Sequence, residues 1–153
     1  MLHTLNHQLL TTEREDQPET KRNNPMPQRT SIYLEGSGHK NPIPNACRIG
    51  NLLMSGLILG MDPETKKVAE TIEQQCELMF IHVKDTVEQA GGTIDDIIKM
   101  TVWLKDRNQR EPVNVEWLKM FPDPHNRPAR QAISAPDLTN GVLVQCDIVA
   151  VIG

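Results

Sequence analysis

Several features that mark common classes of protein are scarce in this chain of 153 residues. Aromatic residues make up 3% of the sequence, and acidic residues exceed basic ones, which gives a net charge of -4. A nucleic acid calls for a basic surface and aromatic platforms for its bases, so we expect no nucleic-acid partner. No apolar run approaches the roughly 20 residues of a membrane-spanning helix, so we expect no membrane partner.

Cysteines and histidines are also few, and their spacing fits neither a disulfide framework nor a metal site. Cys47, Cys76 and Cys146 are an odd number, and each lies within an apolar run. Free thiols buried in a protein from a reducing compartment are the simplest interpretation. His3 and His7 are four residues apart, but no apolar helix face surrounds them, so we expect no metal ion there.

The first 28 residues differ in composition from the rest of the chain. They are polar and mixed in charge, with leucines too few and too isolated to be buried together. No continuous apolar segment follows Met1, so the segment does not read as a secretory signal. We therefore expect residues 1–28 to be a flexible N-terminal extension, residues 29–153 to form one domain, and the protein to be cytoplasmic.

The folded part begins with strand patterns. Residues 30–34 predict a short strand that ends at a glycine-rich turn. Two apolar runs, residues 47–49 and 52–59, flank Gly50-Asn51, a pair suited to a tight two-residue connection. The sequence therefore predicts a β-hairpin here.

A long helix and a second cycle of strand and helix follow. Apolar residues recur every three or four positions from 68 to 87, which predicts an amphipathic helix. Residues 98–104 alternate as a strand does, and residues 113–121 predict a shorter helix. Residues 130–134 and 142–152 predict the final strands. This order predicts an α+β fold in which the helices cover one face of one sheet.

The other face of the predicted sheet mixes polar and apolar side chains. It carries Trp103, Leu143, Gln145, Asp147 and Val149. This set is too apolar for a face exposed to solvent and too polar for a hydrophobic core, so we expect it to form half of a subunit interface. A solvated face with scattered apolar residues is the alternative.

Arg130 is the leading candidate for ligand binding. It follows Pro128-Ala129 at the start of a predicted strand. A guanidinium fixed on a rigid strand can grip a small carboxylate through two parallel hydrogen bonds. On those residues alone, an arginine that is simply exposed to solvent is the commoner outcome. The argument that Arg130 is a clamp, meaning that it binds a carboxylate, comes from the rest of the chain.

Five segments resemble the Rid/YjgF superfamily, the reactive intermediate deaminases, and keep its order from about residue 29 to the end. They are Leu52-Leu53-Met54-Ser55-Gly56, residues 89–92 with residues 95–106, Val113-Asn114, Arg127-Pro128-Ala129-Arg130 and Asp147-Ile148-Val149-Ala150-Val151. Each is weak alone, and together they are specific. The resemblance implies a chorismate-mutase-like (RidA-like) α+β fold, with a mostly antiparallel sheet and two helices on one face. It also implies a homotrimer with clefts at the subunit interfaces.

The resemblance further implies an activity and a site. The best-known branch hydrolyses enamines and imines such as 2-iminopropanoate to a keto acid and ammonia, without a metal or organic cofactor. Arg130 matches the family arginine that binds the substrate carboxylate. Ser55 and Asn114 match positions that line the same cleft.

The chain departs from that branch at several positions. Gln145 stands where the branch has a glutamate that orients the attacking water, and a glutamine can hold a water but cannot take its proton. Ala132 replaces a cysteine, and residues 42–45 show no equivalent of the loop tyrosine. Asp147, on the same strand face as Gln145, is either a base or a structural carboxylate paired within the trimer.

Two functions of different classes therefore remain open. In the first, the protein is a cofactor-free deaminase of enamine or imine intermediates such as 2-imino acids. Arg130 holds the carboxylate at a subunit interface, Gln145 positions a water, and backbone donors polarise the imine. In the second, the same fold is a non-catalytic binding module for a small carboxylate metabolite. The missing glutamate favours the second; an endoribonuclease, a name some family members carry, is a distant third.

Overall fold

The computed structural model describes residues 27–36 and 41–153, so residues 1–26 of the expected extension lie outside the described residues. In chain order the elements are β1 (Thr30–Ile32), β2 (Ala46–Ile49), β3 (Leu52–Ser55), β4 (Ile58–Leu59), α1 (Ile72–Gln89), η1 (Ile94–Asp96), β5 (Ile97–Leu104), η2 (Arg107–Gln109), α2 (Glu111–Met120), β6 (Ala129–Ser134) and β7 (Val144–Val151). The strands form one sheet in the order β1-β2-β3-β7-β5-β6, and β4 also pairs with β7. Every pairing is antiparallel except that of β5 with β6. The predicted α+β fold with a mostly antiparallel sheet is confirmed.

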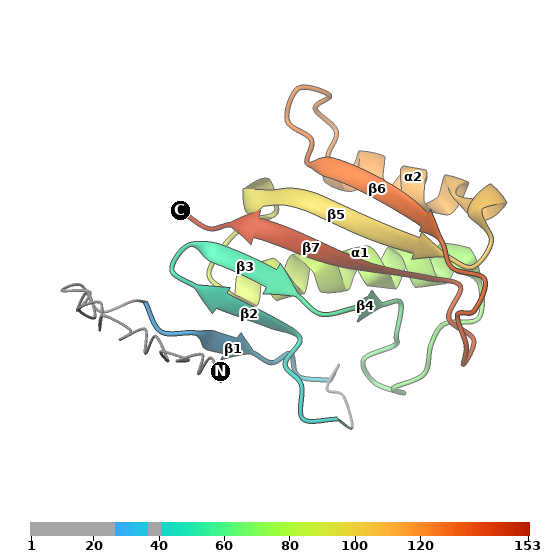
Figure 1. The fold of residues 1–153 in the computed structure, drawn as a ribbon. Helices are drawn as coiled ribbons and strands as arrows, with labels where there is room; N and C mark the ends of the chain where they lie inside the picture. The colour runs from blue at the N-terminus through green and yellow to red at the C-terminus, as the bar shows by residue number, and fades with distance from the viewer. Residues whose placement is uncertain (1–26, 37–40) are drawn as a thin grey trace, which may run out of the picture.

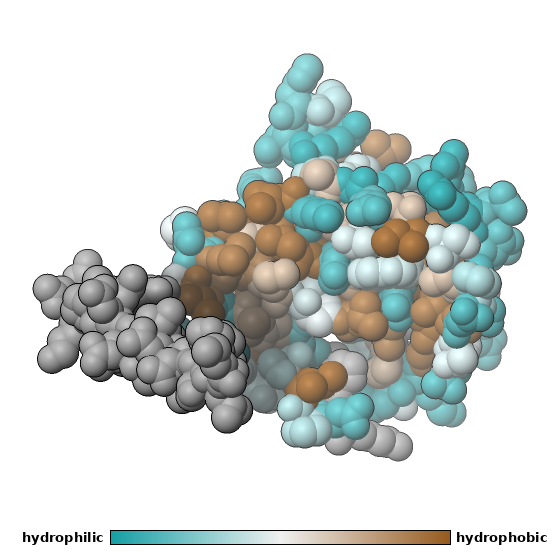
Figure 2. All heavy atoms as spheres, in the orientation of Figure 1, coloured by the Kyte–Doolittle hydropathy of each residue, from teal (hydrophilic) through white to brown (hydrophobic). Residues whose placement is uncertain are grey.

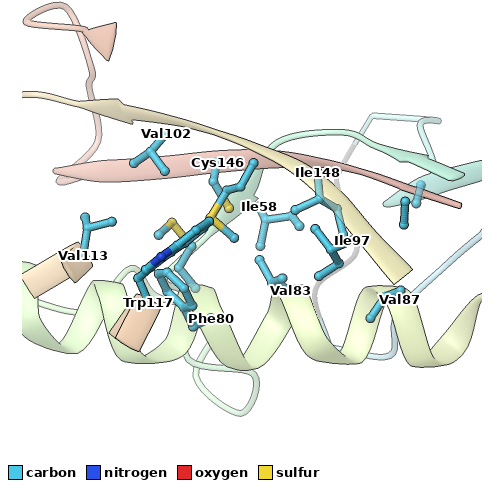
Figure 3. Packing of buried hydrophobic residues seen from close by; sticks show 14 of the residues in the cluster. Ile58, Phe80, Val83, Val87, Ile97, Val102, Val113, Trp117, Cys146 and Ile148 are labelled. Atoms are coloured by element: carbon cyan, nitrogen blue, oxygen red, sulfur yellow. The ribbon is translucent and has the colours of Figure 1, made fainter. Parts of the chain in front are cut away.

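Both α-helices lie against the same side of the sheet, as Figure 1 shows. The core fills the space between these two layers. In Figure 3, Cys146 and Ile148 of β7 point toward Phe80 and Val83 of α1. Along β7 the residues with even numbers are buried and those with odd numbers are not, which is the alternation expected of a strand with one covered face.

Helix α1 begins at a capping box, four residues later than its apolar periodicity predicts. The Thr71 hydroxyl accepts a hydrogen bond from the Gln74 backbone amide, and the Gln74 Oε1 accepts one from the Thr71 backbone amide. Val68, expected on the helix, instead bridges to Met61. The cap residue therefore fixes the start of the helix more strongly than the apolar spacing does.

The strand predicted over residues 52–59 is broken after Ser55. The Gly56 amide turns away to donate to the Asn45 carbonyl at 2.8 Å. The Ser55 hydroxyl accepts from the Ile148 amide at 2.9 Å and so keeps β3 joined to β7 at the break. Beyond it, β4 passes so close to α1 that a Cβ on Gly60 would collide with the Gln75 carbonyl. Ser55 and Gly60 therefore both have structural roles.

The uncovered face of the sheet has the mixed character that the sequence predicts, with one exception. Trp103, Gln145, Asp147 and Val149 lie on it and are half-buried in the isolated chain. Leu143, predicted on this face, precedes β7 and packs partly against the core. Figure 2, which views this face, shows hydrophobic side chains gathered over β3 and the end of β7. The apolar patch, as we call its exposed part, consists of Ile49, Leu52, Met54, Ile98 and Val151.

Candidate functional site

The guanidinium of Arg130 is held by two side chains of α2. Its Cζ lies 4.7 Å from the centroid of the Trp117 ring, and its Nη2 donates to Asn114 Oδ1 at 2.7 Å. The face of the Trp117 ring attracts the cation, and the side-chain amide of Asn114 holds one edge of the planar guanidinium. A guanidinium has five N–H donors, so donors remain for a ligand.

Helix and strand geometry explain why these three groups meet. Asn114 and Trp117 are three residues apart on α2 and so project from one face of the helix. On the edge strand β6, Arg130 lies opposite Met100 of β5, which is buried, so Arg130 points to the helix side of the sheet. Asn114 Nδ2 donates to Glu111 Oε2 at 3.0 Å, which leaves its oxygen facing the arginine.

Arg130 borders a hollow of about 280 Å³ between β6 and the start of α2. Its lining residues are Val102, Leu104, Arg110, Val113, Asn114, Arg130 and Ala132. Two of these side chains, Arg110 and Arg130, are cations, and none is a carboxylate. Although the guanidinium stays accessible to solvent, packing against Trp117 removes part of its hydration, and this lowers the pKa of Arg130; nearby Arg110 lowers it further. Two guanidinium groups without a carboxylate beside them make the hollow favourable for an anion.

Gln145 and Asp147 do not share this hollow. Gln145 lies opposite Trp103 of β5, and Asp147 lies opposite Thr101, on the uncovered face of the sheet. Arg130 lies on the helix-covered face. A ligand bound at Arg130 therefore cannot reach Gln145 of the same chain.

Ser55 also lies apart from Arg130. In the sheet, β7 and β5 separate β3 from β6. Three strand spacings of about 4.8 Å each place the Ser55 backbone about 14 Å from that of Arg130. Of the four residues predicted to line one site, the structure brings Arg130 and Asn114 into contact and leaves Ser55 and Gln145 elsewhere in the chain.

Sequence reasoning missed two residues at this site: Trp117, which contacts Arg130, and Arg110, which lines the hollow. Trp117 was assigned to the apolar face of a helix, and it is indeed 8% exposed, yet its ring also supports Arg130. Its spacing of three from Asn114 was the available signal. Arg110 drew no attention because it precedes the predicted helix. Its spacing of four from Asn114 would have placed it at the same end of α2.

Neither a metal cluster nor a spanning helix is found in the described part of the chain. No group of three or more His, Cys, Asp or Glu side chains in residues 27–36 and 41–153 is arranged to hold a metal ion. Within the same residues, neither helix is long and apolar enough to cross a membrane.

Comparison with known proteins identifies the family. The sequence model of the family described as Endoribonuclease L-PSP matches residues 41–152. A RutC family protein from Haemophilus influenzae is 32% identical over 112 residues, 72% of this chain and 86% of that protein. A Salmonella typhimurium protein named 2-iminobutanoate/2-iminopropanoate deaminase is 31% identical over 112 residues, 72% of this chain and 87% of that protein. The crystal structure of RidA from an Antarctic Psychrobacter has a TM-score of 0.74 and 27% identity, covering 80% of this chain and 99% of that one. The chain therefore belongs to the Endoribonuclease L-PSP family, the Rid/YjgF family that its sequence motifs resemble.

Proposed function

We propose that this protein is a cofactor-free deaminase that hydrolyses reactive enamine and imine intermediates, the 2-imino acids, to keto acids and ammonia. The observation that carries the proposal is the guanidinium of Arg130, fixed by Trp117 and Asn114 at the edge of a hollow that has no carboxylate in its lining. A relative that is 31% identical bears the name of such a deaminase. The substrate carboxylate is the group that Arg130 would hold.

Positioning is the main task that this reaction sets. Water adds to the imine carbon, its proton passes to the nitrogen, and the carbon–nitrogen bond then breaks to release ammonia and the keto acid. The imine nitrogen is itself basic, so the proton need not go to a carboxylate of the protein. A glutamine that orients the water and an arginine that fixes the carboxylate therefore suffice for the chemistry.

The proposed site takes residues from two subunits. Gln145 and the hollow at Arg130 lie on opposite faces of the sheet. The apolar patch lies on the same uncovered face as Gln145, and a second subunit would remove that patch from water. We propose a homotrimer in which the uncovered face of one subunit meets the Arg130 edge of the next.

A binding module for a small carboxylate is the second candidate. One observation favours it: the side chain of Gln145 cannot accept a proton from water. The carboxylate of Asp147 lies two residues further along β7, opposite Thr101 rather than Trp103. In that case Arg130 holds a metabolite and no bond breaks.

Ammonia release from freshly generated 2-imino acids separates the two candidates. We expect release above the spontaneous rate, and a roughly 100-fold lower kcat/KM for Arg130→Ala because the bidentate contact is lost. Arg130→Lys should recover little, since an ammonium cannot form the fork. Arg107→Ala removes a neighbouring cation outside the hollow and serves as the control.

Each outcome decides between the candidates. Carboxylate binding that depends on Arg130, without ammonia release above background, would establish the binding module. An Arg130→Ala protein equal to the parent in both assays would remove the clamp and both candidates with it.

A further inference from the structure

The hollow beside Arg130 contains a second guanidinium that the reaction of a simple 2-imino acid does not need. Arg110 precedes α2, and its carbonyl accepts hydrogen bonds from the amides of Val113 at 3.1 Å and Asn114 at 3.3 Å. These bonds fix the backbone of Arg110 relative to Asn114, which contacts Arg130. Arg110 is therefore a built part of the hollow's rim.

No carboxylate neutralises this pair of cations from within the hollow. Neither Arg110 nor Arg130 forms an ion pair with any residue in the described ranges. The nearest acidic residue in sequence, Glu111, bonds to Asn114 and lines a different hollow, together with Glu73 and Glu116. The lining of the Arg130 hollow thus carries two positive charges and no negative one.

Burial is the larger cause of the lowered pKa of Arg130. Arg110 lowers this pKa further, because like charges in a small space repel each other. An anion with one charge, held at Arg130, leaves the second guanidinium without a partner. An anion with two charged ends relieves the repulsion and satisfies both forks. The volume of about 280 Å³ suits a small ligand of this kind.

We propose that the hollow selects small ligands with two carboxylates, Arg130 holding the one beside the reacting carbon and Arg110 the distal one. This inference rests on the proposed function for the identity of the site, and its substrate would be a 2-imino diacid. The distal contact made by Arg110 would be the specificity determinant.

Calorimetric binding to the full chain tests the ligand class without any turnover. The probes are succinate and monomethyl succinate, which has the same carbon skeleton with one carboxylate blocked. We expect the parent to bind succinate about tenfold more tightly than the monoester. Arg110→Gln should abolish this preference and retain binding of the monoester. Arg107→Gln, which removes a nearby cation outside the hollow, should keep the preference.

Other results overturn the inference. Equal affinities of the parent for succinate and monomethyl succinate would show that Arg110 does not bind a second carboxylate. A preference for succinate that survives Arg110→Gln would show the same. A third probe, 2-carboxyethylphosphonate, distinguishes the kind of anion: affinity tenfold above that of succinate would replace the dicarboxylate class with a phosphate-bearing one.

Turnover separates this inference from the proposed function. 2-Iminosuccinate and 2-iminopropanoate, generated in the assay by amino acid oxidases, are the substrates to compare. A higher kcat/KM for 2-iminosuccinate that Arg110→Gln removes supports both. A succinate preference without turnover of either imine overturns the deaminase and supports the ligand class. No binding of either succinate probe overturns the clamp at Arg130 and the inference together.

Discussion

Arg130 and Gln145 lie on opposite faces of the same sheet. Arg130 is opposite Met100, whose side chain is in the core, whereas Gln145 is opposite Trp103 on the uncovered face. Side chains opposite each other in a ladder share a face, and successive side chains along a strand alternate. If both residues act on one ligand, they must come from different subunits.

Mixing two inactive variants tests the shared site directly. Arg130→Ala and Gln145→Leu should each be inactive, because each removes one half of every site. Unfolded together in equal amounts and refolded, they should recover about a quarter of the parent's ammonia release, because in the proposed homotrimer each mixed trimer regains one intact site of three. Either variant refolded alone is the control. Recovery of no activity from mixed trimers would place the site within one subunit.

Replacing Gln145 by glutamate tests what the glutamine does. In the deaminase, Gln145→Glu should raise kcat about tenfold, because a carboxylate whose pKa is tuned toward neutrality can take a proton from the attacking water. In a binding module, the same change should weaken carboxylate binding through charge repulsion and create no activity. Gln89→Glu, on the exposed surface of α1, controls for the added charge. Rates and affinities unchanged by Gln145→Glu would exclude Gln145 from the site.

Most of the fold could be predicted from the sequence, because burying one side of a helix or strand imposes a regular spacing of apolar residues along the chain. The alternation of Val144, Cys146 and Ile148 marks a strand covered on one side, and the structure shows that strand. The break after Ser55 was missed because the apolar run continues past it. What breaks the strand is a contact of Gly56 with Asn45, and a contact between distant segments leaves no periodic signal.

The candidate site was harder to predict, for a related reason. Arg130 and Asn114 carry family motifs, so their shared cleft was expected, and the structure brings them into contact. Trp117 supports Arg130 and is also a core residue, and a periodic pattern reveals only the second role. Within one chain, Ser55 and Gln145 lie apart from Arg130. In the proposed homotrimer they would meet Arg130 only through the packing of subunits, which the pattern of one chain does not encode.

The apolar patch predicts the assembly. Met54 is 52% exposed on the uncovered face of the sheet, and Ile81 is 47% exposed on α1. In the proposed homotrimer, Met54→Lys would bury an unpaired charge and should dissociate the assembly, whereas Ile81→Lys should not. Light scattering should give three times the 17.3 kDa chain mass for the parent and for Ile81→Lys. A parent of monomeric mass at micromolar concentration would refute the trimer.

Gln75 should contribute strongly to stability because it ties α1 to two loops. Its side chain is fully buried, and Nε2 donates to the carbonyls of Ala69 and Gly141, each at 2.8 Å. Its Oε1 accepts from the Leu143 amide at 2.8 Å. Gln75→Leu would leave these backbone groups without partners, and we expect a loss of about 2–4 kcal/mol in the free energy of unfolding. Denaturant titration measures it, with Gln89→Leu as the exposed control; equal losses for both would contradict the argument.

The three thiols should differ in reactivity. Burial raises the pKa of Cys76 to about 12, with smaller contributions from Glu116 and Glu73. Burial also raises the pKa of Cys146, and Asp147 adds to the effect. Cys47 is only half-buried. Because the thiolate is the reactive form, iodoacetamide at about pH 8 should modify Cys47 of the dissociated Met54→Lys chain first and the other two only on unfolding, since Cys47 lies opposite Met54 on the face that the proposed homotrimer covers. Peptide mass spectrometry resolves the sites, and early labelling of Cys146 would show that the core opens.

The same shifts predict how stability depends on pH. An unfolded thiol ionises near pH 9.0, whereas the folded chain keeps Cys76 protonated to about pH 12. The unfolded state therefore releases its proton first, so the two thiols stabilise the fold fully below about pH 9 and progressively less above it. Cys146→Ala should be less stable than the parent at about pH 8, because it leaves a cavity, yet lose less stability between about pH 8 and pH 11. Denaturant titrations at both pH values measure the two losses. If the variant and the parent lose the same amount, the Cys146 thiol is not protonated by burial in the native protein.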